Sequence, residues 1–405
     1  MVRSRSLPVR PPTRPPLRVA AAALAGLALL AAGCSDGGSG GGSDGGPGSP
    51  DRTGATAGPS PDGSRSPGSS PAPAEGSAKV VDTVAKGLDS PWGLAPLPDG
   101  DLLVSSRDEG TISLVDAESG KVSELGSVPG VDPGGEGGLL GIAVSPDFAE
   151  DRQVYAYFTS ASDNRIVRML YEADEEEGNR LGAPSTVLRG IPKGMIHNGG
   201  RIAFGPDRML YAGTGDSGDR SLAQDRESLG GKILRMTPDG EPPGSGNPDA
   251  DSVVYSWGHR NVQGLAWDAE ERLWAAEFGQ NTWDELNLIR PGGNYGWPEV
   301  EGEAGEEGFT DPVAQWRPAD ASPSGIAVAE GSVWMAALRG ERLWRVPLDG
   351  AERVAEPQAF LEGEYGRLRT VVSDGGDGLW LVTSETDSRG TPAEDDDRIL
   401  KLEVS

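Results

Sequence analysis

Residues 196–219 read IHNGGRIAFGPDRMLYAGTGDSGD and contain the pattern that decides the fold. A short apolar run at 201–204 is followed by a Gly-Pro-Asp turn at 205–207 and then by a second apolar run. Both ends of an antiparallel hairpin lie at the same edge, so we expect His197 and Asp216 to lie together there, away from the turn. An imidazole beside a carboxylate is suited to proton transfer.

The same hairpin pattern occurs six times along the chain. The copies begin at Gly93, Gly141, Arg201, Gly264, Gly325 and Thr370. Irregular spacing around a constant hairpin indicates fixed inner strands joined by variable loops, which is typical of a β-propeller. Residues 79–405 are therefore predicted to form an all-β, six-bladed β-propeller. We expect the run 399–402 to pair with Val80 and Val81 and to close the ring.

The composition limits the classes of partner. The chain has 405 residues, with 63 acidic against 36 basic side chains and a net charge of -27. Such a charge repels nucleic acid and anionic lipid surfaces, so neither is expected as a partner. The 61 glycines and 33 prolines suit a turn-rich all-β domain together with a low-complexity segment.

Residues 1–34 are predicted to be an export signal. A basic opening precedes an apolar run at 19–32, which is short for a membrane span. The run ends in Ala31-Ala32-Gly33-Cys34, which resembles the bacterial lipobox, where the cysteine carries lipid after cleavage. An ordinary signal peptide with an incidental thiol is the alternative. On the lipobox interpretation, we expect an extracytoplasmic lipoprotein that contacts the membrane only through its lipid anchor.

Residues 35–78 contain Gly, Ser, Pro and Asp with almost no apolar side chains. Such a segment cannot bury a core, so we expect a disordered tether. Its expected role is to space the propeller from the membrane.

One face of the propeller is expected to collect the residues that flank the hairpins. This set includes His197, Asp216, His259, Arg260, Asn261, Arg339, Arg367 and Arg369. Each could be an ordinary loop or ion-pair residue, but their convergence favours a functional site. Arginine is suited to bidentate binding of carboxylates or phosphates, so we predict a pocket for a multiply anionic small molecule. His259 is instead expected to be structural.

Several long motifs carry a resemblance over residues 79–405. They are GHRNVQGLAW at 258–267, EFGQNTWDELNLI at 277–289 and GGNYGWP at 292–298, with GLLG at 138–141. In this order they resemble the soluble pyrroloquinoline quinone (PQQ)-dependent glucose and sorbosone dehydrogenases, especially the aldose sugar dehydrogenase branch. The resemblance implies a propeller whose mouth holds PQQ, a tricarboxylate quinone, and a calcium ion.

The resemblance also implies roles for the central residues. His197 would take the proton from the anomeric hydroxyl of the sugar, and Asp216 would orient His197 and stabilise its protonated form. Arg260 and Asn261 would hold the cofactor, with Arg260 polarising the reacting carbonyl.

Other residues are assigned to the cofactor and the metal by the same resemblance. Arg339, Arg367 and Arg369 would bind cofactor carboxylates. The backbone carbonyls of Gly279 and Gln280 would ligate calcium, which prefers oxygen donors.

Five positions need separate comment. Asp284, Glu285 and Tyr295 fall where the family holds a second, structural calcium, although acids capping a turn would give the same pattern. Glu136, near the cofactor, stands where glutamine is common, and its carboxylate would repel PQQ unless it were protonated or turned away. Ile196 replaces an aspartate of the glucose-oxidising enzymes, which favours a broader range of aldoses.

The leading hypothesis is PQQ- and calcium-dependent oxidation of aldoses to lactones, with electrons passed to an external acceptor. One alternative is an inactive ligand-binding propeller, which only Glu136 supports. Another is a calcium-dependent lactonase, which would need several carboxylate or asparagine side chains facing a metal in the channel.

Overall fold

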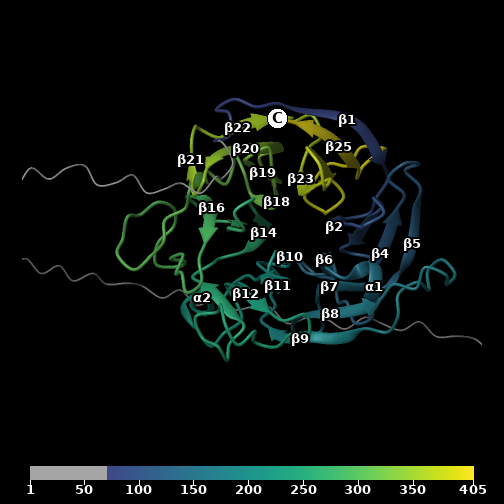
Figure 1. Ribbon diagram of the computed structural model, residues 1–405, viewed down its shortest axis with the longest axis horizontal. Coiled ribbons are helices and arrows are strands. Elements are labelled where there is room, and N and C mark those ends of the chain that lie inside the picture. Colours follow the sequence, from purple (N-terminus) through teal and green to yellow (C-terminus); the bar gives the residue numbers. More distant parts are fainter. Residues whose placement is uncertain (1–70) are drawn as a thin grey trace, which may run out of the picture. The chain divides into compact units, whose positions relative to one another are not determined.

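Six antiparallel sheets form a ring in the protein's computed structural model, which describes residues 71–405 (Figure 1). The helices in this part of the chain are two single turns, α1 (Phe148–Asp151) and α2 (Ser221–Gln224). The prediction of an all-β, six-bladed β-propeller is therefore confirmed.

Each blade runs from an inner strand at the axis to an outer strand at the rim. Blade one contains β2 (Pro91–Pro96), β3 (Leu102–Ser106), β4 (Thr111–Val115) and β5 (Val122–Ser127). Blade two contains β6 (Leu139–Val144), β7 (Gln153–Thr159), β8 (Asn164–Leu170) and β9 (Ser185–Ile191). Blade three contains β10 (Ile202–Phe204), β11 (Leu210–Gly213), β12 (Lys232–Met236) and β13 (Val254–Trp257).

The remaining blades follow the same plan. Blade four contains β14 (Val262–Trp267), β15 (Leu273–Glu277), β16 (Asp284–Ile289) and β17 (Ala314–Trp316). Blade five contains β18 (Pro323–Ala329), β19 (Ser332–Ala337), β20 (Arg342–Asp349), β21 (Glu352–Arg353) and β22 (Gln358–Phe360). Blade six contains β23 (Leu368–Ser373), β24 (Gly378–Thr383), β25 (Ile399–Val404) and β1 (Ala78–Ala85).

Blade six closes the ring because it combines strands from both ends of the described chain. β1 pairs antiparallel with β25, and Val80 lies opposite Leu402 as predicted. Val81 falls at a register shift between Val80 and Asp82, so it is not part of the regular ladder.

The inner strands open with small residues because they approach their neighbours closely. At Gly141 a Cβ atom would lie 2.2 Å from the carbonyl oxygen of Gly200 in the next blade. No side chain fits at that distance, so glycine is required where blades two and three meet. The repeated small residue of the hairpin pattern thus reflects the packing around the axis.

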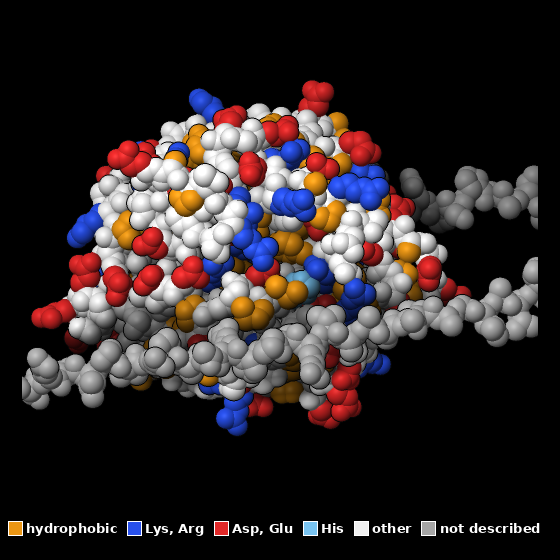
Figure 2. Space-filling view, turned by 180° about the vertical axis from the view of Figure 1, so that it is seen from behind, with side chains coloured by type: hydrophobic (Ala, Val, Ile, Leu, Met, Phe, Trp, Pro, Cys, Tyr) orange, Lys and Arg blue, Asp and Glu red, His pale blue; other side chains and the backbone are white. Residues whose placement is uncertain are grey.

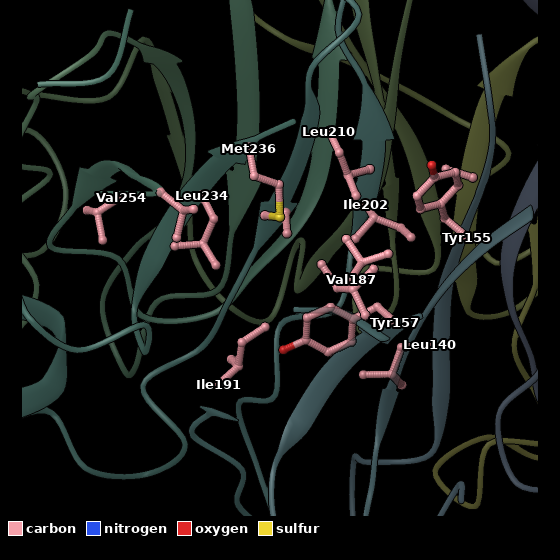
Figure 3. Close-up of a cluster of buried hydrophobic side chains, with 14 of the residues drawn as sticks. Leu140, Tyr155, Tyr157, Val187, Ile191, Ile202, Leu210, Leu234, Met236 and Val254 are labelled. Atoms are coloured by element: carbon pink, nitrogen blue, oxygen red, sulfur yellow. The ribbon is translucent and has the colours of Figure 1, made fainter. Parts of the chain in front are cut away.

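Apolar side chains fill the spaces between blades. Between blades two and three, Tyr157, Ile202, Leu234 and Met236 are buried in one cluster (Figure 3). Truncating one such side chain typically lowers the free energy of unfolding by about 2–5 kcal/mol, so the packing between blades contributes strongly to the stability of the ring.

The chain contacts the propeller ahead of residue 79, where the sequence was expected to begin the domain. The amide of Ala72 donates to the Leu348 carbonyl oxygen (2.9 Å), and Arg345 donates to that of Pro73 (2.9 Å). Residues 1–70 lie outside the described part, and with them the predicted export signal, Cys34 and most of the predicted tether. Within 71–405, no helix is long and apolar enough to cross a membrane.

Candidate active site

A cavity of about 380 Å³ lies at one end of the ring, where the inner strands begin. We call it the mouth cavity. The predicted residues that line it are Glu136, His197, Arg260, Asn261, Gly279, Gln280, Asp284, Arg339, Arg367 and Arg369. Trp92, Arg107, Gln263, Asp387 and Arg389 also line it but were missed by the sequence analysis. Basic side chains gather beside a histidine on this face (Figure 2).

His197 and Asp216 meet as the hairpin predicted. The imidazole Nδ1 lies 2.6 Å from Asp216 Oδ1, and the indole of Trp297 donates to Oδ2 (2.9 Å). Burial alone would raise the pKa of Asp216, but hydrogen bonds from His197, Trp297 and the Gly218 amide bring that pKa below its ordinary value. An ionised carboxylate accepts the Nδ1 proton, which leaves the His197 Nε2 lone pair free to act as a base.

The backbone of His197 is held in an unusual conformation. Its φ is 56°, in the left-handed region that few non-glycine residues adopt. The His197 amide donates to Glu136 Oε2 (2.9 Å), and its carbonyl accepts from the Ser217 amide (3.1 Å). Gly215 must be glycine, because a Cβ there would lie 1.9 Å from the His197 carbonyl oxygen. The loops on both sides therefore fix the direction of the imidazole.

Glu136 is held in place by two partners. One carboxylate oxygen accepts the His197 amide, and the other forms an ion pair with Arg389 (2.7 Å). The negative charge that the sequence analysis expected to repel PQQ is thus balanced. Arg389 lies in the loop between β24 and β25, 253 positions away from Glu136. In the sequence, only the position of Arg389 in a loop at the mouth end of a blade indicated that it could line the cavity.

Arg367 and Arg369 share a buried carboxylate. Both guanidinium groups contact Asp387 Oδ2, at 2.9 and 2.8 Å. Although burial opposes ionisation, the charges of Arg369 and Arg367 lower the pKa of Asp387 to about 2. Arg107 donates to the Asp387 backbone carbonyl (3.2 Å) and so joins the same group.

Arg260 lines the mouth cavity and has an unsatisfied atom. Its Nε is buried and has no hydrogen-bond partner among the described residues. Burial lowers the pKa of this guanidinium, which lies over the Trp297 ring with Cζ 5.4 Å from the centroid. A buried donor without a partner is costly, so a ligand acceptor at this point would be favoured. Its neighbour Asn261 accepts the Gly199 amide (2.9 Å) and holds the loop after His197.

The turn after β15 presents backbone carbonyls. Asp284 Oδ1 accepts the Gly279 amide (2.8 Å), and Glu301 Oε1 accepts the four amides of residues 280–283 at 2.7 to 3.2 Å. In a trans peptide the carbonyl points opposite to the next residue's N–H. The carbonyls of Gly279 and Gln280 therefore point away from Glu301. Glu301 was missed because a lone acid in a loop carries no motif.

The three residues expected at a second calcium site do not form one group. Adjacent strand residues face opposite sides, so Asp284 lines the mouth cavity while Glu285 and Tyr295 line a separate cavity of about 10 Å³. Burial raises the pKa of Asp284 to about 6, and burial together with Glu277 raises that of Glu285 to about 8. Tyr295 donates its hydroxyl hydrogen to the Leu288 carbonyl (2.7 Å).

His259 has the structural role expected of it. Its side chain is buried, and its ring nitrogens lie 2.8 Å from Ser256 Oγ and 2.8 Å from Glu277 Oε1. The ring also stacks on Tyr295, with centroids 4.7 Å apart. These contacts hold His259 away from the mouth cavity.

Comparison with known proteins identifies the family of this chain. The family model described as glucose/sorbosone dehydrogenase matches residues 88–391. The chain belongs to this family. Aldose sugar dehydrogenase YliI of Escherichia coli (strain K12) is 30% identical over 339 residues, which cover 76% of this chain and 90% of the relative.

Two further proteins are similar to this chain. Quinoprotein glucose dehydrogenase B of Acinetobacter calcoaceticus is 33% identical over 284 residues, 61% of this chain and 59% of the relative. The PQQ-bound form of aldose sugar dehydrogenase from Streptomyces coelicolor is 73% identical. That match covers 82% of this chain and 100% of the solved chain, with a TM-score of 0.82.

Proposed function

We propose that this protein oxidises aldose sugars at the anomeric carbon to lactones, using PQQ and calcium and passing electrons to an external acceptor. The observation that carries the proposal is the His197–Asp216 pair in a cavity that six arginines also line. The names of the similar dehydrogenases support the same reaction class.

The mouth cavity fits an anionic quinone. A volume of about 380 Å³ lies within the usual range for small-molecule sites. Arg367 and Arg369, which share Asp387, and the exposed Arg339 line the cavity and supply positive charge for carboxylates, and the unpartnered Nε of Arg260 is a donor for a carbonyl oxygen. When bound, PQQ would supply the two-electron acceptor that no protein side chain provides.

Calcium is supported by the donor set beside this cavity. The carbonyls of Gly279 and Gln280 point away from the carboxylate that holds their loop, and both residues line the cavity with Asp284. Hard oxygen donors of this kind suit calcium.

The chain's own residues account for the proton transfer. His197 Nε2 takes the proton of the anomeric hydroxyl, and the hydride on the anomeric carbon would go to bound PQQ, the two-electron acceptor. Asp216 then stabilises the imidazolium through the 2.6 Å contact with Nδ1. Arg260 would hold the carbonyl oxygen of the bound quinone and supply positive charge beside it.

The test is His197→Ala in protein loaded with PQQ and calcium, assayed with aldoses and a redox dye. General-base catalysis contributes about 10²–10⁴-fold, so we expect a loss of turnover of that size with PQQ binding retained. Turnover close to that of the unchanged protein would contradict the proposal. An aldose panel in the same assay defines substrate range.

The alternatives lack a specific observation in their favour. The Glu136–Arg389 pair removes the reason for expecting an inactive propeller. For a lactonase, the residues from 71 to 405 contain no group of three or more His, Cys, Asp or Glu side chains that could hold a metal.

We also propose that Cys34 carries a lipid anchor that holds the protein at the outer side of the cytoplasmic membrane. The support is the sequence ahead of Cys34, the single cysteine of the chain. Cys34→Ala should move the protein from the membrane fraction to the soluble fraction, and an unchanged distribution would contradict the anchor.

A further inference from the structure

A second cavity occupies the axis of the propeller. It has a volume of about 250 Å³, and all six inner strands line it. Each inner strand contributes an apolar side chain, namely Leu94, Ile142, Phe204, Leu265, Ile326 and Val371. We call this cavity the axial channel.

Arg201 separates the axial channel from the mouth cavity. Arg201 lines the channel, Trp92 lines the mouth cavity, and the Arg201 Cζ lies 4.4 Å from the Trp92 ring centroid. Arg201 is 7% exposed. Its guanidinium therefore supplies a positive charge at one end of an otherwise apolar channel.

The charge of Arg201 has only neutral hydrogen-bond partners. Its Nε donates to the Gln263 carbonyl (2.7 Å) and one Nη donates to Thr370 Oγ1 (3.0 Å). Among residues 71–405, no carboxylate lies within ion-pair distance of Arg201. Burial, with repulsion from the nearby Arg369, lowers the pKa of Arg201 to about 9. Buried cations are normally paired, so the site favours an anion.

We propose that the axial channel binds a short aliphatic monocarboxylate, with its carboxylate on Arg201 and its alkyl chain along the inner strands. A sugar is disfavoured because apolar walls cannot satisfy its hydroxyl groups. A multiply charged anion is disfavoured because the channel offers one guanidinium. This site is distinct from the mouth cavity and does not depend on the proposed dehydrogenase activity.

The test is calorimetric titration of the full chain with octanoate. The protein is loaded with PQQ and calcium, so that the arginines of the mouth cavity are occupied. We expect binding that strengthens about fourfold per methylene from butanoate to octanoate, because each buried CH₂ adds a constant increment. Octylammonium should not bind, since it carries the wrong charge.

Two buried arginines that both lie against the Trp92 ring provide a matched pair of variants. Arg201→Gln should weaken octanoate binding about 10–100-fold, the usual value of a charge-assisted hydrogen bond. Arg369→Gln, which alters the mouth cavity, should leave octanoate binding unchanged. Ala203 lines the channel, so Ala203→Phe should block octanoate while retaining both arginines and aldose turnover. This variant covers the case in which Arg201→Gln fails to fold.

Three results would overturn the proposal. The first is absence of octanoate binding, and the second is binding whose strength does not change with chain length. The third is loss of binding in Arg369→Gln but not in Arg201→Gln or Ala203→Phe, which would place the ligand in the mouth cavity. Aldose turnover is measured separately, so failure of the dehydrogenase proposal would be seen independently.

Discussion

At the residue scale, the reactivity of the site depends on how Asp216 is satisfied. Its carboxylate is 1% exposed and receives hydrogen bonds from His197, Trp297 and the Gly218 amide. All three partners can donate a hydrogen bond to the ionised carboxylate, so Asp216 stays ionised although it is buried. That arrangement both selects the His197 tautomer and stabilises its protonated form.

Asp216→Asn tests this arrangement. An amide cannot balance the imidazolium and can hold the wrong tautomer, so we expect turnover to fall by about 10²–10⁴-fold. The fall should appear in kcat more than in PQQ affinity. Steady-state kinetics across pH, with PQQ titration as the control, measure both. Equal activity of Asp216→Asn and the unchanged protein would rule out the proposed role.

At the element scale, two carboxylates, the buried Asp387 and the half-buried Glu301, tie mouth loops to the blades. Asp387 connects the β24–β25 loop to Arg367 and Arg369, at the start of β23. Glu301 connects the loop before β17 to the turn after β15. In each case one carboxylate accepts hydrogen bonds from several donors. These contacts fix the loops that form the walls of the mouth cavity.

The pH dependence of stability should reveal the role of Asp387. Its folded pKa of about 2 lies below the ordinary value of 3.8, so its contribution is present above about pH 4 and is lost as the pH falls toward 2. The shift corresponds to about 2 kcal/mol. Asp387→Asn should therefore lower the free energy of unfolding by about that amount at pH 7. Urea denaturation should show the difference between variant and parent shrinking below pH 4.

Glu301→Gln is expected to weaken calcium binding. The uncharged amide accepts the four loop amides less strongly, so the carbonyls of Gly279 and Gln280 lose their alignment. Residues that orient ligands usually affect metal affinity by about 10–100-fold, and we expect a loss in that range. Calcium titration of chelator-treated protein measures it. Glu303→Gln removes the same charge from an exposed position nearby and should leave the affinity unchanged.

At the scale of the whole molecule, the two ends of the described chain hold the ring together. β1 and β25 pair along blade six, and Leu402 packs with Ala78 and Val80 in one apolar cluster. The mouth cavity exists only when all six blades are in place, because its walls come from every blade. Ring closure and the site are therefore expected to be lost together.

Leu402→Ala tests the closure. Leu402 is fully buried, so truncation should lower the free energy of unfolding by about 2–5 kcal/mol. Leu170→Ala, at a side chain that is 40% exposed, should cost much less. Denaturant unfolding of both variants gives the comparison. A similar cost for the two would mean that the β1–β25 seam contributes little.

The sequence alone determined the blades, because a hairpin is local. Its turn residues, alternating strands and small opening residue lie within about 15 positions, so six copies could be read directly. The same locality placed His197 beside Asp216. The order of the motifs resembled that of the dehydrogenase family, and this resemblance indicated the cofactor residues around Arg260.

Only the tertiary structure decided which distant loops meet. The ion pair of Glu136 with Arg389 joins positions 253 apart, and the local sequence around either residue does not predict its partner. The isolation of Arg201 from every described carboxylate likewise depends on which strands surround the axis. The separation of Asp284 from Glu285 follows from strand alternation, but which side faces the mouth depends on how blade four packs against its neighbours. Electrostatic pairing acts through space, and only the closed ring fixes those distances.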